Sequence, residues 1–159
     1  VRVNDTEGYL PVSGNATVKQ VTEDEIAEVQ QDALESSNSY KRQQVVDYAL
    51  QFVGGRYKYG GSDPRTGVDC SGFTRYVLQN SAGIGMNRSS GGQASQGVAI
   101  GADQMQPGDL LFYGSGRGIN HVAMYIGNGQ IVHASTERTG ITISNWNYRN
   151  PVKIVNVLG

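Results

Sequence analysis

The chain has 159 residues, 17% of them charged, and its formal net charge of −1 gives no electrostatic reason to expect nucleic acid or an anionic membrane surface as a partner. The length suits one domain with a short appendage. No apolar run approaches the roughly 20 residues that cross a bilayer, so a membrane span is not expected. The sequence begins at Val1 and not at Met, which suggests a piece of a longer protein, so the lack of a visible signal peptide decides little.

The first 38 residues are predicted to form an arm or linker ahead of the main domain. Within them, Thr22 and Glu25 have the spacing of a capping box, and apolar residues over 26–33 fall on one helical stripe, which predicts a helix. The polar stretch SSNS at 36–39 is expected to end this helix.

The main domain is predicted to span 39–159 and to open with a second helix. Val45 and Ala49 lie on one face of that helix, and the glycine pair at 54–55 is a common helix ending. A glycine-rich loop then leads into the sequence VDCSGF at 68–73.

A third helix is predicted to begin at Cys70, the only cysteine of the chain, and to end near Gly83. The N–H groups in the first turn of a helix carry the positive end of its dipole, which favours a thiolate. The same groups can donate to an oxyanion that develops on a substrate carbonyl. Cys70 could therefore be a nucleophile, and the plain alternative is a buried core thiol.

After residue 104 the apolar residues recur with a period of two, which predicts short β-strands separated by turns. Five such strands are expected, in the stretches DLLFYGS, HVAMYI, QIVHAS, GITISNW and VKIVNVL. Helices followed by strands, without β-α-β alternation, indicate an α+β fold in which N-terminal helices pack on a mainly antiparallel β-sheet.

A cysteine nucleophile needs a base, and the two histidines of the chain, His121 and His133, both fall in one predicted hairpin. A two-residue turn at its tip would place them on opposite faces. A three-residue turn at 127–129, with a left-handed glycine and a bulge, would place His133 opposite Ala123 and diagonal to His121 on one face. We therefore predict the three-residue turn, with the small Ala123 leaving room for the Cys70 helix to pack over the histidines.

These residues also have other interpretations. A histidine in a β-strand is usually structural. One cysteine and two histidines could bind zinc, but the eleven residues between the histidines are unlike the short ligand spacings of structural zinc sites. We therefore expect neither a metal nor another cofactor.

Six motifs follow one another across residues 40–155: RYKYGG, VDCSGF, NRSSGGQ, MQPGDLLFY, HVAMYIGNG and IVHAS. In this set the chain resembles the NlpC-type cell-wall peptidases, papain-like cysteine enzymes that cut the stem peptides of bacterial peptidoglycan. The resemblance implies a papain-like fold and an endopeptidase that hydrolyses the amide bond between γ-D-glutamate and the diamino acid, through a thioester on the cysteine.

The resemblance also implies catalytic roles for individual residues. Cys70 matches the family's nucleophile, His121 its general base, and His133 the polar residue that orients the base. Tyr57 matches a tyrosine whose hydroxyl lies near the nucleophile and helps to hold the oxyanion. The plain alternative for Tyr57 is a core tyrosine.

Three further residues match positions that border the substrate. Asp69 and Ser71 flank the nucleophile, and Asp69 would pair with a free amino group of the stem peptide. Arg88 would border the same groove. The plain alternatives are that Asp69 only caps the helix and that Arg88 is a solvated surface charge.

The expected partners are peptidoglycan stem peptides or muropeptides, with no nucleic acid and no membrane span, for a monomer that is secreted and associated with the cell wall. Residues 1–20 resemble the last strands of a bacterial SH3-like wall-binding module, and a plain linker is the alternative. Two other functions stay open: an amidase or acyl- or peptidyl-transferase that uses the same papain-like site, and an inactive wall-binding module. The sequence leaves open which diamino acid the substrate contains, and whether free stems or intact wall is cut.

Overall fold

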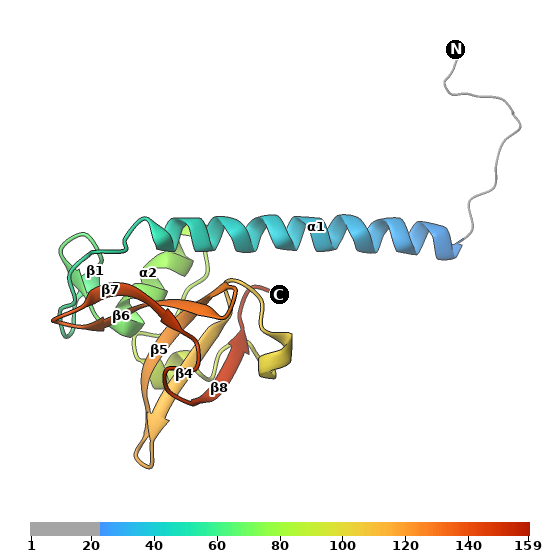
Figure 1. Ribbon diagram of the computed structural model, residues 1–159. Coiled ribbons are helices and arrows are strands. Elements are labelled where there is room, and N and C mark those ends of the chain that lie inside the picture. Colours follow the sequence, from blue (N-terminus) through green and yellow to red (C-terminus); the bar gives the residue numbers. More distant parts are fainter. Residues whose placement is uncertain (1–22) are drawn as a thin grey trace, which may run out of the picture. The chain divides into compact units, whose positions relative to one another are not determined.

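The computed structural model of the protein describes residues 23–159, with side chains from Ser36 onward (Figure 1). The predicted helix cap and the resemblance over 1–20 therefore lie outside the described residues. The chain divides into two units, Val1–Ser37 and Asn38–Gly159, and the second, called the C-terminal unit below, holds every strand that the structure describes. Among the described residues, no helix has the length and apolar character needed to cross a membrane.

Helix α1 runs without interruption from Glu23 to Leu50. The predicted break at 36–39 is wrong, because serine and asparagine only weaken a helix, and the stretch contains neither glycine nor proline. The chain then makes turns up to Gly54, whose φ of 95° suits glycine. The helix therefore ends about a turn before the predicted glycine pair.

A six-stranded antiparallel sheet with the order β3-β8-β4-β5-β6-β7 forms the centre of the C-terminal unit (Figure 1). All five predicted strands are present in it, so the α+β class with a mainly antiparallel sheet is confirmed. The strands are β3 (Val98–Ala99), β4 (Leu110–Ser115), β5 (Gly118–Gly127), β6 (Gln130–Thr136), β7 (Gly140–Asn145) and β8 (Pro151–Asn156). The other elements are β1 (Ser62–Asp63), β2 (Gly67–Val68), α2 (Cys70–Ala82), α3 (Ser90–Gln93) and the 3-10 helix η2 (Ala102–Gln104).

Helix α2 begins and ends where the sequence predicts. Its N-cap is Asp69, whose side chain accepts a hydrogen bond from the Gly72 N–H at 2.8 Å. Its C-cap is Gly83, which is left-handed with a φ of 69°, and the N–H groups there close the last turn. These two caps fix Cys70 as the first residue of the helix.

The two faces of the sheet belong to different buried clusters. The larger cluster joins helices to the sheet and includes Phe73, Val77, Phe112, Val122 and Val132. The smaller cluster lies on the other face and consists of Leu111, Tyr113, Ala123, Ile131 and Ile154. Ala123 therefore points away from α2, and the prediction that it makes room for the Cys70 helix is wrong. Because neighbouring strand residues alternate between faces, Val122 packs toward the helix instead.

The turn between β5 and β6 differs from the predicted one. It has two residues, Asn128 and Gly129, both with positive φ, of 55° and 75°. One extra residue, Ile126, then forms a bulge in β5, beyond which Tyr125 opposes Ile131. The three-residue turn is thus wrong, but the bulge adds the odd residue that the predicted register requires.

A buried ion pair ties the second half of α1 to the rest of the C-terminal unit. Arg42 Nη1 lies 2.8 Å from Asp109 Oδ1, and only 4% and 1% of the two side chains are exposed. The same guanidinium donates to the carbonyl oxygens of Pro107 and Gly159 and to the side chain of Asn156. One side chain therefore holds the start of β4 and the end of the chain.

Replacing Arg42 by methionine should lower the free energy of unfolding by about 3–5 kcal/mol, because Asp109 is left as an unpaired buried charge. Urea denaturation of the C-terminal unit measures this loss. Replacing both residues by apolar ones should restore much of it, and the neighbouring Gln43→Ala is the exposed control. An Arg42→Met variant as stable as the wild type would contradict the prediction.

Candidate active site

Cys70 is a half-buried free cysteine at the first position of α2. The backbone N–H groups of Val122, of Ser71 and of Cys70 itself lie near its sulfur and favour the charged form. Burial first, and then the charge of Asp69, raise the pKa of the thiol, and the three N–H groups lower it by less. The resting cysteine is therefore a neutral thiol, so the start of the helix does not by itself produce the expected thiolate.

The sulfur lies where strands β5 and β6 separate. Their ladder covers Met124–Gly127 of β5 and Gln130–Val132 of β6, although both strands continue beyond it. Alternate N–H groups of an antiparallel strand point to the same side, so the N–H of Val122 is directed like that of Met124, toward β6. The Cys70 sulfur lies near this N–H, which favours the charged form of the thiol. The thiol thus occupies a gap in the sheet.

The two histidines bridge this gap. His121 Nε2 lies 2.7 Å from His133 Nδ1, which confirms that the two side chains share a face. His121 opposes Tyr113 in the β4–β5 ladder and so lies on the face of the smaller cluster. This arrangement leaves Nδ1 of His121 as the ring nitrogen that can exchange a proton with a thiol.

Aromatic rings surround the histidine pair and keep it neutral. The Tyr113 ring lies 5.8 Å from the His121 ring, and the Tyr148 ring lies 5.2 Å from the His133 ring. Burial lowers the pKa of His121 to about 3, with His133 and the charge of Arg149 acting in the same direction. Burial also lowers the pKa of His133 to about 4.

A hollow of about 560 Å³ opens beside the cysteine. It is lined by all the residues predicted to meet the substrate or the oxyanion: Tyr57, Asp69, Ser71 and Arg88, together with Cys70. The two buried histidines do not line it. Burial, followed by the charges of Cys70 and Asp69, raises the pKa of Tyr57, so its hydroxyl keeps the proton that it would donate to an oxyanion.

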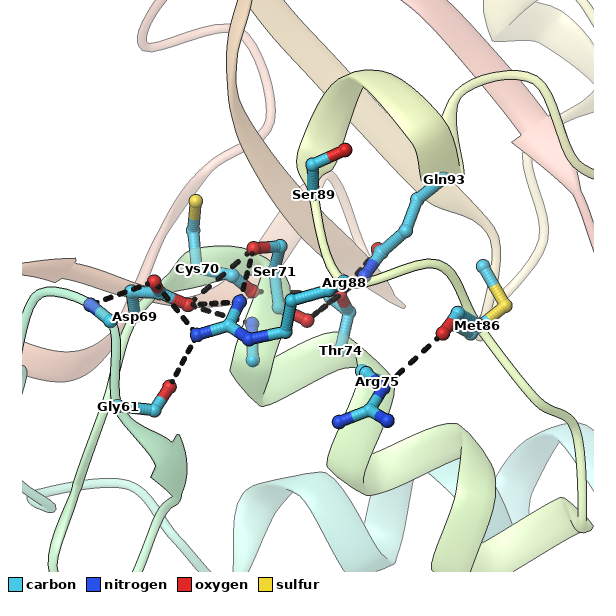
Figure 2. Close-up of polar contacts among 12 residues, drawn as sticks. Gly61, Asp69, Cys70, Ser71, Thr74, Arg75, Met86, Arg88, Ser89 and Gln93 are labelled. Atoms are coloured by element: carbon cyan, nitrogen blue, oxygen red, sulfur yellow. Dashed lines mark hydrogen bonds and ion pairs between the residues drawn. The ribbon is translucent and has the colours of Figure 1, made fainter.

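Figure 2 shows the Arg88 side chain extending from its loop to Asp69 at the start of α2. Its two terminal nitrogens lie 3.0 and 3.1 Å from the two carboxylate oxygens, a bidentate pair. It also donates to the Ser71 hydroxyl and the Gly61 carbonyl, while Asp69 accepts further bonds from the N–H groups of the Gly60 loop and of its own helix. Asp69 therefore does cap the helix, and Arg88 is a fixed group with 39% of its side chain exposed.

Two residues near the site were missed by the sequence reading. Ser144 of β7 has its hydroxyl oxygen 2.9 Å from Nε2 of His133. Gln93 is fully buried and bonds the Thr74 hydroxyl and the carbonyls of Ser71 and Asn87, which fixes the Arg88 loop onto α2. Gln93 ends the NRSSGGQ motif, but its role, like that of Ser144, depends on contacts with other segments that no local pattern shows.

Replacing His133 by asparagine should weaken the loss of stability in acid. The folded-state pKa of each histidine lies below its ordinary value near 6.5, so only the unfolded chain takes up protons as the pH falls from 6.5 toward 4. Each histidine should thereby cost about 2 kcal/mol of stability between pH 6.5 and 5.

Urea denaturation at pH 7, 6 and 5 measures this dependence. His133→Asn should remove roughly half of the histidine contribution, whereas Ser135→Ala, a change in the same strand, should leave the pH dependence unaltered. Equal slopes for wild type and His133→Asn would show that the histidine does not titrate as described.

Comparison with known proteins places this geometry in a family. Residues 54–155 match the model of the NlpC/P60 family. Over 90 residues the chain is 44% identical to the "Probable endopeptidase p60" of Listeria innocua, which covers 57% of this chain and 19% of that protein. Over 108 residues it is 42% identical to the "Gamma-DL-glutamyl hydrolase" of Bacillus subtilis, with 67% and 25% covered. The solved NlpC/p60 domain of the peptidoglycan hydrolase SagA has a TM-score of 0.67 at 36% identity, over 72% of this chain and 97% of that one.

The chain thus spans about a fifth to a quarter of the length of the two curated relatives, and nearly all of the solved domain. The likeness to that domain confirms the papain-like α+β class. The family match covers most of the C-terminal unit and more than half of the whole chain. The chain therefore belongs to the NlpC/P60 family, as its motifs predict.

Proposed function

We propose that residues 39–159 form a peptidoglycan endopeptidase that hydrolyses the amide bond between γ-D-glutamate and the diamino acid of stem peptides. One observation carries the proposal: a cysteine at a helix start, in the gap that the His121–His133 pair bridges at 2.7 Å. A thiol, a base and an orienting group on the base are the parts that acyl transfer through a thioester requires.

The first half of the reaction forms the thioester. His121 Nδ1 takes the thiol proton as the Cys70 sulfur bonds to the γ-carbonyl carbon, and the carbonyl electrons move to its oxygen. The N–H groups of the first turn and the Tyr57 hydroxyl hold this oxyanion. The oxyanion then collapses, the C–N bond breaks, and His121 returns its proton to the leaving amine.

The second half releases the product. His121 removes a proton from water, the hydroxide adds to the thioester carbon, and the C–S bond breaks with the proton returning to sulfur. During each transfer the His121 imidazolium donates from Nε2 to Nδ1 of His133. The thiolate and the imidazolium form together, so each offsets the burial that disfavours the other, by about 4 kcal/mol at 4 Å and an effective dielectric constant of 20.

The state of Asp69 bears on how substrate is recognised. Its carboxylate is already held by Arg88 and by N–H groups, so binding a free amine of the stem would have to displace part of this network. A γ-linked D-glutamate keeps its α-carboxylate close to the scissile bond. We therefore assign that carboxylate to Arg88, whose exposed part faces the hollow, with Asp69 holding the guanidinium in place. The amine contact of Asp69 stays a prediction.

The names of similar proteins support this reading. They include an endopeptidase, a γ-glutamyl hydrolase and a peptidoglycan hydrolase, although the chain covers only part of the first two. Peptidoglycan as partner, action outside the cell at the wall, and a monomeric state are parts of the same proposal.

Incubation with defined muropeptides, followed by mass spectrometry, tests the reaction. The wild type should release the diamino acid side of the γ-D-glutamyl bond, and Cys70→Ala should lose at least about 10³-fold in rate. Products joined to an added amine would instead indicate a transferase. Binding to wall without any cleavage would indicate an inactive module, and cleavage that survives Cys70→Ala would exclude the mechanism.

Arg88→Gln should raise KM by roughly 10-fold or more on stems that carry the free α-carboxylate, because a charge-assisted bond is lost. Stems with the carboxamide in that position should be bound about equally by wild type and variant. Arg75→Gln is the matched control, since Arg75 also contacts the loop before Arg88 but lies outside the lining of the hollow. Equal losses on both substrates would contradict the assignment of the carboxylate to Arg88.

A further inference from the structure

Both ring nitrogens of His133 have a hydrogen-bond partner. His133 is fully buried, with Nδ1 at 2.7 Å from His121 Nε2 and Nε2 at 2.9 Å from the Ser144 hydroxyl oxygen. Strand β7 pairs with β6 so that Thr142 opposes His133, which makes Ser144 the diagonal neighbour on the same face. Within residues 36–159, Ser144 is the one hydrogen-bond partner of that nitrogen.

The direction of the two hydrogen bonds decides whether His121 can act as a base. To take a thiol proton, His121 must have its lone pair on Nδ1 and its hydrogen on Nε2. That hydrogen must be accepted by Nδ1 of His133, which therefore carries its own hydrogen on Nε2. The competent state thus needs an acceptor at Nε2 of His133. In the reverse arrangement His133 donates to His121, and Nδ1 of His121 already holds a hydrogen.

We propose that Ser144 is a positioning residue that selects the competent tautomer of His133 by accepting its Nε2 hydrogen. The proposal rests on the proposed function, since it explains how the base of that reaction is kept ready. Ser144 is half-buried at the edge strand of the sheet, so its own hydroxyl hydrogen can be directed to water while the oxygen faces the ring. Cys70, His121, His133 and Ser144 would then form one proton-transfer and hydrogen-bond series.

Loss of the Ser144 hydroxyl should reverse the direction of the hydrogen bond between the two histidines. Without Ser144, the competent tautomer leaves a buried N–H without a partner, which is costly. Moving the hydrogen to Nδ1 avoids that cost, because the hydrogen is then accepted by His121. The Ser144→Ala protein should therefore populate the tautomer in which His121 cannot accept a proton. We expect roughly a tenfold fall in kcat with little change in KM, since Ser144 does not line the hollow.

Nitrogen-15 NMR of the histidine rings tests the proposal without any substrate. In the wild type at pH 7, His133 should show a protonated Nε2 and an unprotonated Nδ1. Ser144→Ala should shift both signals toward the opposite tautomer, and Ser144→Thr should restore them. Thr142→Val is the matched control, because it removes a hydroxyl from the same strand and face. A wild-type His133 that carries its hydrogen on Nδ1 would overturn the proposal, and this reading holds even if Ser144→Ala fails to fold.

Kinetics with the muropeptide substrate give the second readout. Ser144→Ala should lose kcat, while Ser144→Thr and Thr142→Val should retain it. Unchanged tautomers and an unchanged kcat in a folded Ser144→Ala protein would also overturn the proposal. If the wild type cleaves no muropeptide, the proposed function fails, and the NMR result still decides the role of Ser144 in ordering the histidines.

Discussion

The gap between strands β5 and β6 is the constraint on which the rest of the site depends. The ladder stops at Met124 and Val132, and the Cys70 sulfur lies near the N–H of Val122, just beyond its end. The His121–His133 bond crosses the same gap through side chains. Had the ladder continued, β6 would occupy the place beside Val122 where the thiol now lies. The separation of two strands thus brings a helix start and two imidazoles together.

Burial governs the electrostatics of this gap. It raises the pKa of the thiol and lowers the pKa of both histidines, so the three groups rest uncharged among aromatic rings. Charges are favourable there only when the Cys70 thiolate and the His121 imidazolium form together, in one step. The hollow beside Cys70 is charged at rest, in contrast, because Arg88 and Asp69 are paired charges held in fixed positions before any ligand binds. The site therefore separates a neutral reacting centre from a charged recognition surface.

The sequence predicts those features of this structure that depend on local signals, or on whether the number of residues in a hairpin is odd or even. Asp69 and Gly83 bound α2 because helix caps are local, and the period of two locates the strands. The shared face of the histidines requires only one odd residue in the hairpin, and the bulge at Ile126 supplies it. The predicted turn type was wrong, because the face that the histidines share shows only that an extra residue exists, and not whether it lies in the turn or in the strand.

Other features could not be predicted, for physical reasons of two kinds. Alternation of side chains along a strand does not say which face of the sheet α2 covers, because packing decides that. For this reason the prediction put Ala123 on the wrong face. The contacts of Arg88 with Asp69, and of Ser144 with His133, join segments that no sequence pattern connects. The Arg42 network has a consequence of another sort. Together with Lys41, which bonds the Leu158 carbonyl, it holds the beginning and the end of the C-terminal unit at one place. Ends that lie close together are what insertion into a loop of another protein, or circular permutation, requires of a domain.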